Sequence, residues 1–180
     1  EHADLGSVVI HAAGQELLAE LDGWPYAQSP GGKSSGFFDK RGRRWDYDFN
    51  APNGHNLVML EANYPPLGCA ARATLKHLDL GKGCEMVAVD ATAMHKALAR
   101  RVRRYVIYMR PDLVLLVDEI HARENSRARC MFHYLDKAET GADSFNIASG
   151  GARLVGTSLY PSVEHNIILG KDERHIAYHT

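Results

Sequence analysis

Three residues in the first third of the chain carry side chains that can bind a metal ion: His2, Asp22 and His55. Each lies at the end of an apolar run that we expect to form a β-strand, so an antiparallel fold can bring the three ends together. Two imidazole nitrogens and one carboxylate oxygen suit zinc, and they leave a fourth tetrahedral position for water or another side chain. The sequence therefore predicts a zinc site made by these three residues.

Spacing alone leaves a second interpretation open. An aspartate before a glycine, as in Asp22-Gly23, is ordinary turn chemistry, and a single histidine is more often a hydrogen-bonded structural residue than a ligand. Asp4 is expected to orient a turn or to accept a hydrogen bond from an imidazole N–H, which metal-bound histidines commonly need. For His133, in an apolar strand, we favour a buried, hydrogen-bonded histidine over a cleft residue.

The 180 residues are enough for one domain, 1–180, with a real core. A 45% hydrophobic and 24% charged composition is that of a globular protein and excludes disordered and fibrous classes. The net charge of −1 provides no global field for a polyanion, and we read the basic clusters Lys40–Arg44 and Arg100–Arg104 as solvated faces. We therefore expect no nucleic-acid partner. No run reaches the ~20 apolar residues that span a bilayer, so we expect no membrane partner either.

Apolar or alternating runs of five to eight residues, bounded by Gly, Pro, Asn and Asp, predict strands rather than helices. We expect an all-β, antiparallel, two-layer sandwich resembling a supersandwich. The expected strands are Ser7–Ala12, Glu16–Leu21, Leu57–Ala62, Ala71–Leu78, Cys84–Asp90, Ala97–Met109, Leu113–Ile120, Arg127–Leu135, Ser144–Ala148, Arg153–Leu159, Glu164–Leu169 and Ile176–His179.

One of these strands has no polar face. Leu113–Val117 reads LVLLV, so Val114 and Leu116 should lie on one face of the sheet and the other three residues on the opposite face. An uninterrupted apolar strand is typical of a sheet covered on both sides, and a sandwich supplies that cover. A tight turn through Arg110-Pro111-Asp112 should lead into it.

Gly23–Asn53 is expected to be a long irregular loop. It holds seven aromatic residues, which should pack on the sandwich, on a partner domain or on a sugar. The three cysteines, Cys69, Cys84 and Cys130, are an odd number, which excludes a complete disulfide framework. A bridge between Cys69 and Cys84 remains possible, and the alternative is that all three are small core residues.

Five segments together resemble the C-terminal β-domain of the heparinase II/III-like polysaccharide lyases, over most of residues 2–135. They are His2–Ser7, Leu21–Gly23, Gly54–Asn56, Arg103–Glu119 (RRYVIYMRPDLVLLVDE) and the pair Phe132-His133. In that family the residues matching His2, Asp22 and His55 bind zinc, so the resemblance implies zinc as the cofactor here. It also implies a periplasmic or extracellular location.

The family cleaves uronic-acid polysaccharides, of the glycosaminoglycan or alginate type, by β-elimination. Most of its catalytic groups come from an N-terminal α-helical toroid, which nothing in this sequence resembles. Because the chain begins with Glu1 rather than methionine, we expect it to be a fragment of a longer protein that carries such a domain as its partner. The isolated chain is then expected to lack lyase activity.

If the chain contributes to the cleft, we expect Tyr26 and Tyr47 as proton-transfer residues, and Arg43 and Arg44 as contacts to a substrate carboxylate or sulfate; neither tyrosine aligns with a catalytic tyrosine of the family. Aromatic residues that pack on the sandwich are the alternative for the two tyrosines. The alternative for the whole chain is a non-enzymatic carbohydrate-binding or structural β-sandwich domain.

Overall fold

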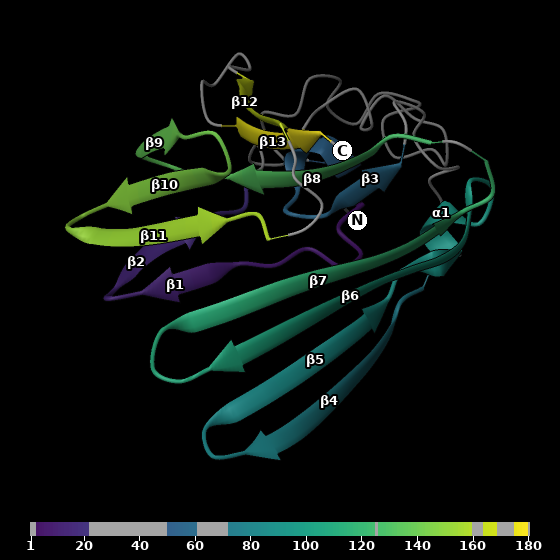
Figure 1. Cartoon of the computed structure of the whole chain (residues 1–180), viewed down its shortest axis with the longest axis horizontal. Coiled ribbons are helices and arrows are strands. Elements are labelled where there is room, and N and C mark those ends of the chain that lie inside the picture. Colours follow the sequence, from purple (N-terminus) through teal and green to yellow (C-terminus); the bar gives the residue numbers. More distant parts are fainter. Residues whose placement is uncertain are drawn as a thin grey trace, which may run out of the picture. The chain divides into compact units, whose positions relative to one another are not determined.

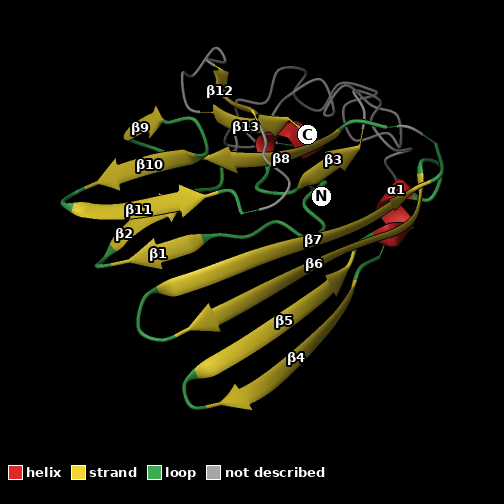
Figure 2. Cartoon of the chain, viewed as in Figure 1, coloured by secondary structure: helices red, strands yellow, loops and turns green. Residues whose placement is uncertain are grey.

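The computed structural model describes residues 3–21, 50–60, 72–124, 126–159, 164–168 and 175–179, the last two ranges through their backbone. These residues form antiparallel strands almost throughout, which confirms the predicted all-β, sandwich-like fold (Figures 1 and 2). The chain divides into two compact units, Glu1–Ala62 with Arg127–Thr180 and Asn63–Ser126.

The second unit is one four-stranded antiparallel sheet in the order β4-β5-β6-β7. Its elements are β4 (Thr74–Gly81), β5 (Cys84–Asp90), a one-turn helix α1 (Thr92–His95), β6 (Ala99–Met109) and β7 (Leu113–Ala122). The turn between β4 and β5 places Lys82 between two glycines, all three with positive φ. The predicted turn through Arg110-Pro111-Asp112 is confirmed between β6 and β7, with a cis Arg110–Pro111 peptide bond.

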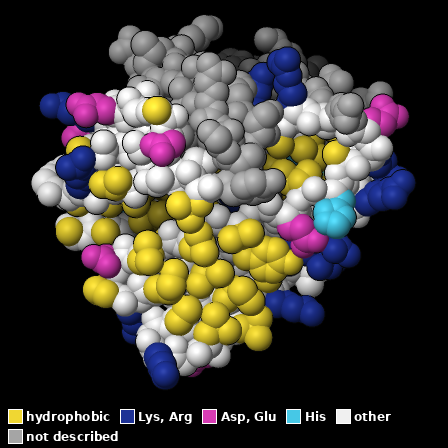
Figure 3. Space-filling model, viewed as in Figure 1, with side chains coloured by type: hydrophobic (Ala, Val, Ile, Leu, Met, Phe, Trp, Pro, Cys, Tyr) yellow, Lys and Arg dark blue, Asp and Glu magenta, His cyan; other side chains and the backbone are white. Residues whose placement is uncertain are grey.

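A continuous apolar row crosses all four strands of this sheet. Leu78 pairs with Met86, Met86 with Ile107, and Ile107 with Leu115, so the four side chains lie on one face. Figure 3 shows hydrophobic side chains gathered over this part of the molecule. Hydrophobic packing across the strands thus holds the sheet in register.

The prediction that both faces of Leu113–Val117 are covered is wrong. The register places Val114 and Leu116 on one face and the other three residues on the opposite face, as expected. However, Leu113 is 56% exposed and Val117 is 41% exposed. Leu78 of β4, on the same face of the sheet, is 45% exposed as well, so the exposure belongs to this face of the sheet rather than to β7 alone.

The first unit holds three further groups of strands. β1 pairs with β2, β10 lies between β9 and β11, and a four-stranded sheet runs in the order β12-β13-β8-β3. The elements are β1 (Ile10–Ala12), β2 (Gln15–Leu18), the 3-10 turn η3 (Pro52–Gly54), β3 (Val58–Leu60), β8 (Ala128–His133), β9 (Lys137–Thr140), β10 (Ser144–Ser149), β11 (Ala152–Thr157), β12 (Glu164–Ile168) and β13 (His175–His179).

The core of the first unit is built from aliphatic and aromatic side chains. Leu17, Leu57 and Ile147 are each at most 1% exposed. The rings of Phe132 on β8 and Phe145 on β10 pack with their centroids 5.6 Å apart. Three polar residues share this interior, His55, Asn56 and His133, and they belong to the candidate site.

All twelve predicted strands have counterparts, and three short elements were missed: β9, α1 and η3. β9 has the polar sequence KAET and lacks a strand signature, and its pairing with β10 holds it in place. Helix α1 is four residues long, too short for a helical period to show in the sequence. Asp90 supports its first turn by accepting a hydrogen bond from the Thr92 N–H at 3.0 Å.

Candidate metal centre

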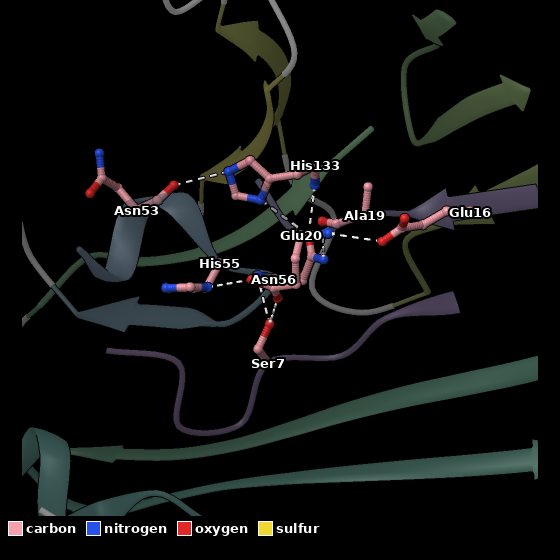
Figure 4. A network of polar contacts seen from close by, with 8 residues as sticks. All are labelled: Ser7, Glu16, Ala19, Glu20, Asn53, His55, Asn56 and His133. Carbon is pink, nitrogen blue, oxygen red and sulfur yellow. Dashed lines mark hydrogen bonds and ion pairs between the residues drawn. The ribbon is translucent and has the colours of Figure 1, made fainter. Parts of the chain in front are cut away.

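A carboxylate and an imidazole meet inside the first unit. Glu20, just after β2, and His55, between η3 and β3, form a hydrogen bond and ion pair between Oε2 and Nδ1. The His55 side chain is 1% exposed, whereas a third of the Glu20 side chain reaches solvent. Figure 4 shows the pair together with the polar residues around it.

Ser7 holds the other oxygen of the same carboxylate. Its hydroxyl donates to Oε1 of Glu20, and its oxygen accepts a hydrogen bond from the Asn56 backbone N–H at 3.0 Å. The Ser7 hydroxyl therefore contacts the carboxylate rather than an imidazole nitrogen. This geometry does not suit a serine nucleophile, which needs a histidine base within reach of its oxygen.

Asn56 is fully buried and joins three segments of the chain. Its amide Nδ2 donates to the Ala19 carbonyl at 2.7 Å, and its Oδ1 accepts from the His133 backbone N–H at 2.6 Å. These two partners fix which end of the amide carries the oxygen.

The prediction that His133 is a buried, hydrogen-bonded histidine is confirmed. It is 0% exposed, with Nδ1 3.1 Å from Oδ1 of Asn56 and Nε2 3.0 Å from the Asn53 carbonyl oxygen. Both neighbours are acceptors, so two full hydrogen bonds require a proton on each ring nitrogen.

Electrostatics keep Glu20 ionised. Burial alone would raise the pKa of its carboxyl, but the hydrogen bonds from His55 and Ser7 and the nearby imidazoles outweigh burial and hold the pKa below its usual value. An ionised carboxylate only accepts hydrogen bonds, so Nδ1 of His55 is the donor. In the neutral ring, Nε2 then carries the lone pair that a metal ion needs, and Figure 4 shows it pointing away from Glu20.

The structure describes one of the three predicted metal ligands, His55; His2 and Asp22 lie outside the described residues. Within the described ranges, no three histidine, cysteine, aspartate or glutamate side chains group together as a metal site. The four predicted cleft residues, Tyr26, Arg43, Arg44 and Tyr47, also lie outside the described residues.

The described sequence neighbours of all three predicted ligands converge. Ala3, which follows His2 in the sequence, donates its N–H to the Asn50 carbonyl at 3.0 Å, and Val8 donates to the Asn56 carbonyl at 3.2 Å. Glu20, two positions before Asp22, contacts His55 directly. Within the first unit, the segments adjoining the three predicted ligands therefore lie side by side.

Two further sequence predictions, on Asp4 and on the cysteines, are refined by the structure. Asp4 does take part in a turn, since its carbonyl accepts from the Ser7 N–H at 2.9 Å, but the carboxylate that meets the imidazole belongs to Glu20. Cys84 has a free thiol, as does Cys130, so the possible Cys69–Cys84 bridge is not formed.

The basic cluster Arg100–Arg104 is more than a solvated face. Arg103 pairs with Asp90 at 2.9 Å, Arg101 with a glutamate of β7, and Arg104 is buried. Three of its four arginines are thus neutralised within the sheet, and they offer little charge to an anionic ligand. The other cluster, Lys40–Arg44, lies outside the described residues.

Sequence reasoning missed Ser7, Glu20 and Asn56 as site residues. Their positions, 13 and 36 residues apart, follow no spacing rule. Ser7 and Asn56 do belong to the resembling segments His2–Ser7 and Gly54–Asn56, whereas for Glu20 the available signal was its position two residues before Asp22. Their contacts arise from tertiary packing, which no local pattern encodes.

In the part of the chain that the structure describes, no helix is long and apolar enough to cross a membrane. Comparison with known proteins adds no assignment: no family model matches the chain, and no curated protein matches it.

Proposed function

We propose that this chain is the zinc-binding β-sandwich module of a polysaccharide lyase that cleaves uronic-acid polysaccharides by β-elimination. The observation that supports it most is the His55–Glu20 pair, because a buried histidine whose Nδ1 donates to a carboxylate is arranged as metal-binding histidines are. The convergence of the segments that adjoin His2 and Asp22 adds support.

In this proposal His2, Asp22 and His55 hold the ion, and the zinc ties three segments of the first unit into one corner. Zinc bound by such ligands supplies positive charge and rigidity to the wall of a cleft. The chain's own contribution is the positioning of these ligands from strand ends. A partner domain, the N-terminal helical half of the parent protein, would provide most of the elimination machinery.

Elimination next to a uronic carboxylate requires that the carboxylate be neutralised, that a base remove the adjacent proton, and that an acid protonate the leaving oxygen. Arg43 and Arg44 are proposed for the first task, and Tyr26 and Tyr47 for proton transfer. The proposed setting is the periplasm or the exterior of the cell, where such polysaccharides are met.

The test is an assay of the full-length parent on glycosaminoglycans and on alginate, following the near-ultraviolet absorbance of unsaturated uronic ends. We expect product from the parent and none from the 180-residue chain, together with stoichiometric zinc in both by elemental analysis. Saturable sugar binding by the parent without product would instead indicate a carbohydrate-binding domain. Parent protein with neither product nor sugar binding would indicate a structural β-domain.

A further inference from the structure

The Glu20 carboxylate is held at both of its oxygens and at its backbone. Ser7 donates to Oε1, His55 contacts Oε2, and the Glu20 backbone N–H donates to Oε1 of Glu16 at 3.2 Å. A carboxylate bound on both oxygens has little freedom to rotate about its last torsion. Its orientation toward the imidazole is therefore set before any ligand binds.

The contacts also close a ring. Asn56 follows His55 in the chain, and its backbone N–H donates to the Ser7 oxygen at 3.0 Å. Ser7 in turn donates to Glu20, and Glu20 accepts from the His55 ring. The backbone that carries the imidazole and the hydroxyl that orients the carboxylate are thus fastened to each other, a closed circuit visible in Figure 4.

Such a circuit does two things for the imidazole. It fixes the tautomer, because an ionised carboxylate on Nδ1 keeps the ring proton there and leaves Nε2 with its lone pair. It also makes Nε2 a stronger ligand, since a negative charge behind the ring raises its basicity toward a metal ion. The Asn56 amide, anchored to Ala19 and to His133, keeps the segment from shifting.

We infer that Glu20, oriented by Ser7, is the positioning carboxylate of the metal site: it locks His55 in the Nδ1–H tautomer and directs Nε2 to a divalent cation. This inference rests on the proposed function, in which His55 is a zinc ligand. Glu20 is thereby a positioning residue that acts through His55, and its effect is on metal affinity and ring tautomer.

If Glu20 only stabilised the fold, substituting another carboxylate of similar exposure should lower zinc affinity as much as substituting Glu20. Glu16 is the matched control for this comparison. The two side chains belong to the same strand region and are similarly exposed, 32% for Glu16 and 33% for Glu20. In the described part of the chain, Glu16 contacts the Glu20 backbone and the exposed His11, and it forms no hydrogen bond or ion pair with His55. Glu16→Gln therefore makes the same acid-to-amide change outside the ring of contacts, and it keeps a side-chain oxygen that can accept from the Glu20 backbone N–H.

The experiment measures two quantities on the purified chain. The first is the tautomer of His55 in metal-free protein, from the ring nitrogen shifts in long-range ¹⁵N–¹H spectra, with the resonance assigned through His55→Gln. The second is zinc affinity, from competition with a chromophoric chelator. The variants are Glu20→Ala, Glu20→Gln, Ser7→Ala and Glu16→Gln.

We expect the Nδ1–H tautomer of His55 in the unsubstituted 180-residue chain and its loss in Glu20→Ala, with zinc affinity lowered about 10- to 100-fold. Glu20→Gln retains an acceptor but not the charge, so it should keep the tautomer and lose part of the affinity. If Glu20→Ala fails to fold, Glu20→Gln provides the test of the inference. Ser7→Ala should weaken zinc binding less than Glu20→Ala. Glu16→Gln should bind zinc with an affinity within about twofold of that of the unsubstituted chain.

Two failures have different signatures. If His55→Gln removes zinc binding while Glu20→Ala leaves both tautomer and affinity unchanged, the positioning role is overturned and the metal site stands. If zinc does not bind the unsubstituted 180-residue chain, or if His55→Gln leaves zinc binding intact, the proposed metal function fails and the inference fails with it. A loss of affinity in Glu16→Gln equal to that in Glu20→Ala would also overturn the inference, because general destabilisation would explain both.

Discussion

Arg104 on β6 and Asp118 on β7 form a two-point ion pair across neighbouring strands. Nε of the arginine lies 2.8 Å from Oδ1 and Nη2 lies 3.0 Å from Oδ2, and the arginine side chain is 3% exposed. The two residues are directly paired in the sheet register, so both side chains lie on the same face. The geometry is the bidentate arrangement in which arginine binds carboxylates most strongly.

Asp118→Asn is expected to destabilise the chain by about 3 kcal/mol, because removing one partner leaves a buried guanidinium charge without compensation. The measurement is the free energy of unfolding in urea. Glu119→Gln, one position away, removes the partner of the half-exposed Arg101 and should destabilise the chain much less, because solvent screens this pair. Equal effects of the two substitutions would contradict the assignment of Arg104 to a buried pair.

Asp90 makes a pH-dependent contribution to stability. The Thr92 hydroxyl and, after it, the Arg103 guanidinium outweigh partial burial and lower the pKa of Asp90 from 3.8 to about 2. Because the folded pKa is the lower one, this contribution is fully present above about pH 4 and is lost as the pH falls through about 2. Solvent screening of this partly exposed pair limits it to about 1 kcal/mol.

Asp90→Asn should therefore lower stability by about 1 kcal/mol at pH 6, and its difference from the parent should shrink toward pH 2. Urea unfolding at several pH values measures this. Asp112→Asn, in the exposed β6–β7 turn, is the control and should show little difference at either pH. A constant difference for Asp90→Asn across the range would show that Asp90 acts through something other than its charge.

The strand pattern of this chain could be predicted because it is local. In β6 and β7 the β-prone residues, the Arg-Pro-Asp turn and the alternation of faces all lie within one short stretch of sequence. The exposure of Leu113 could not be predicted, because the cover of a side chain depends on what packs against its face of the sheet. That is decided by contacts between residues far apart in the chain.

In the candidate site, too, local features could be predicted from the sequence, whereas contacts between distant residues could not. The chemistry of His55 could be proposed from its residue type, but its carboxylate partner could not be identified. Glu20 lies 35 residues away, and Asp4 was an equally good candidate on sequence grounds. Periodicity identifies elements, whereas polar partners are set by how those elements pack.

Asn56 should be among the least replaceable residues of the first unit. Asn56→Ala removes the partners of the Ala19 carbonyl and the His133 N–H in a fully buried place, and we expect a loss of about 2–4 kcal/mol. Asn56→Asp keeps an acceptor for His133 but cannot donate to Ala19, and it adds a buried charge, so it should not rescue stability. Urea unfolding measures both, and a loss below 1 kcal/mol for Asn56→Ala would contradict the network.

Zinc binding should stabilise the folded chain, because the unfolded chain has no preformed site. We expect a strong chelator to lower the melting temperature of the parent chain, and added zinc to restore it. His55→Ala should melt at a lower temperature than the parent in zinc and should not respond to the chelator. Differential scanning calorimetry with and without the chelator measures all four values.

The pH dependence of this stabilisation has a definite sign. Protons compete with zinc for imidazole nitrogens, so the zinc-dependent part of the melting temperature should fall as the pH drops through the histidine range near ~6.5. Glu20 remains ionised in that range, since its pKa lies below its usual acidic value, so the loss would come from the ligands themselves. A chelator-induced shift that is the same at pH 5 and pH 8, or that persists in His55→Ala, would show that the ion is bound elsewhere.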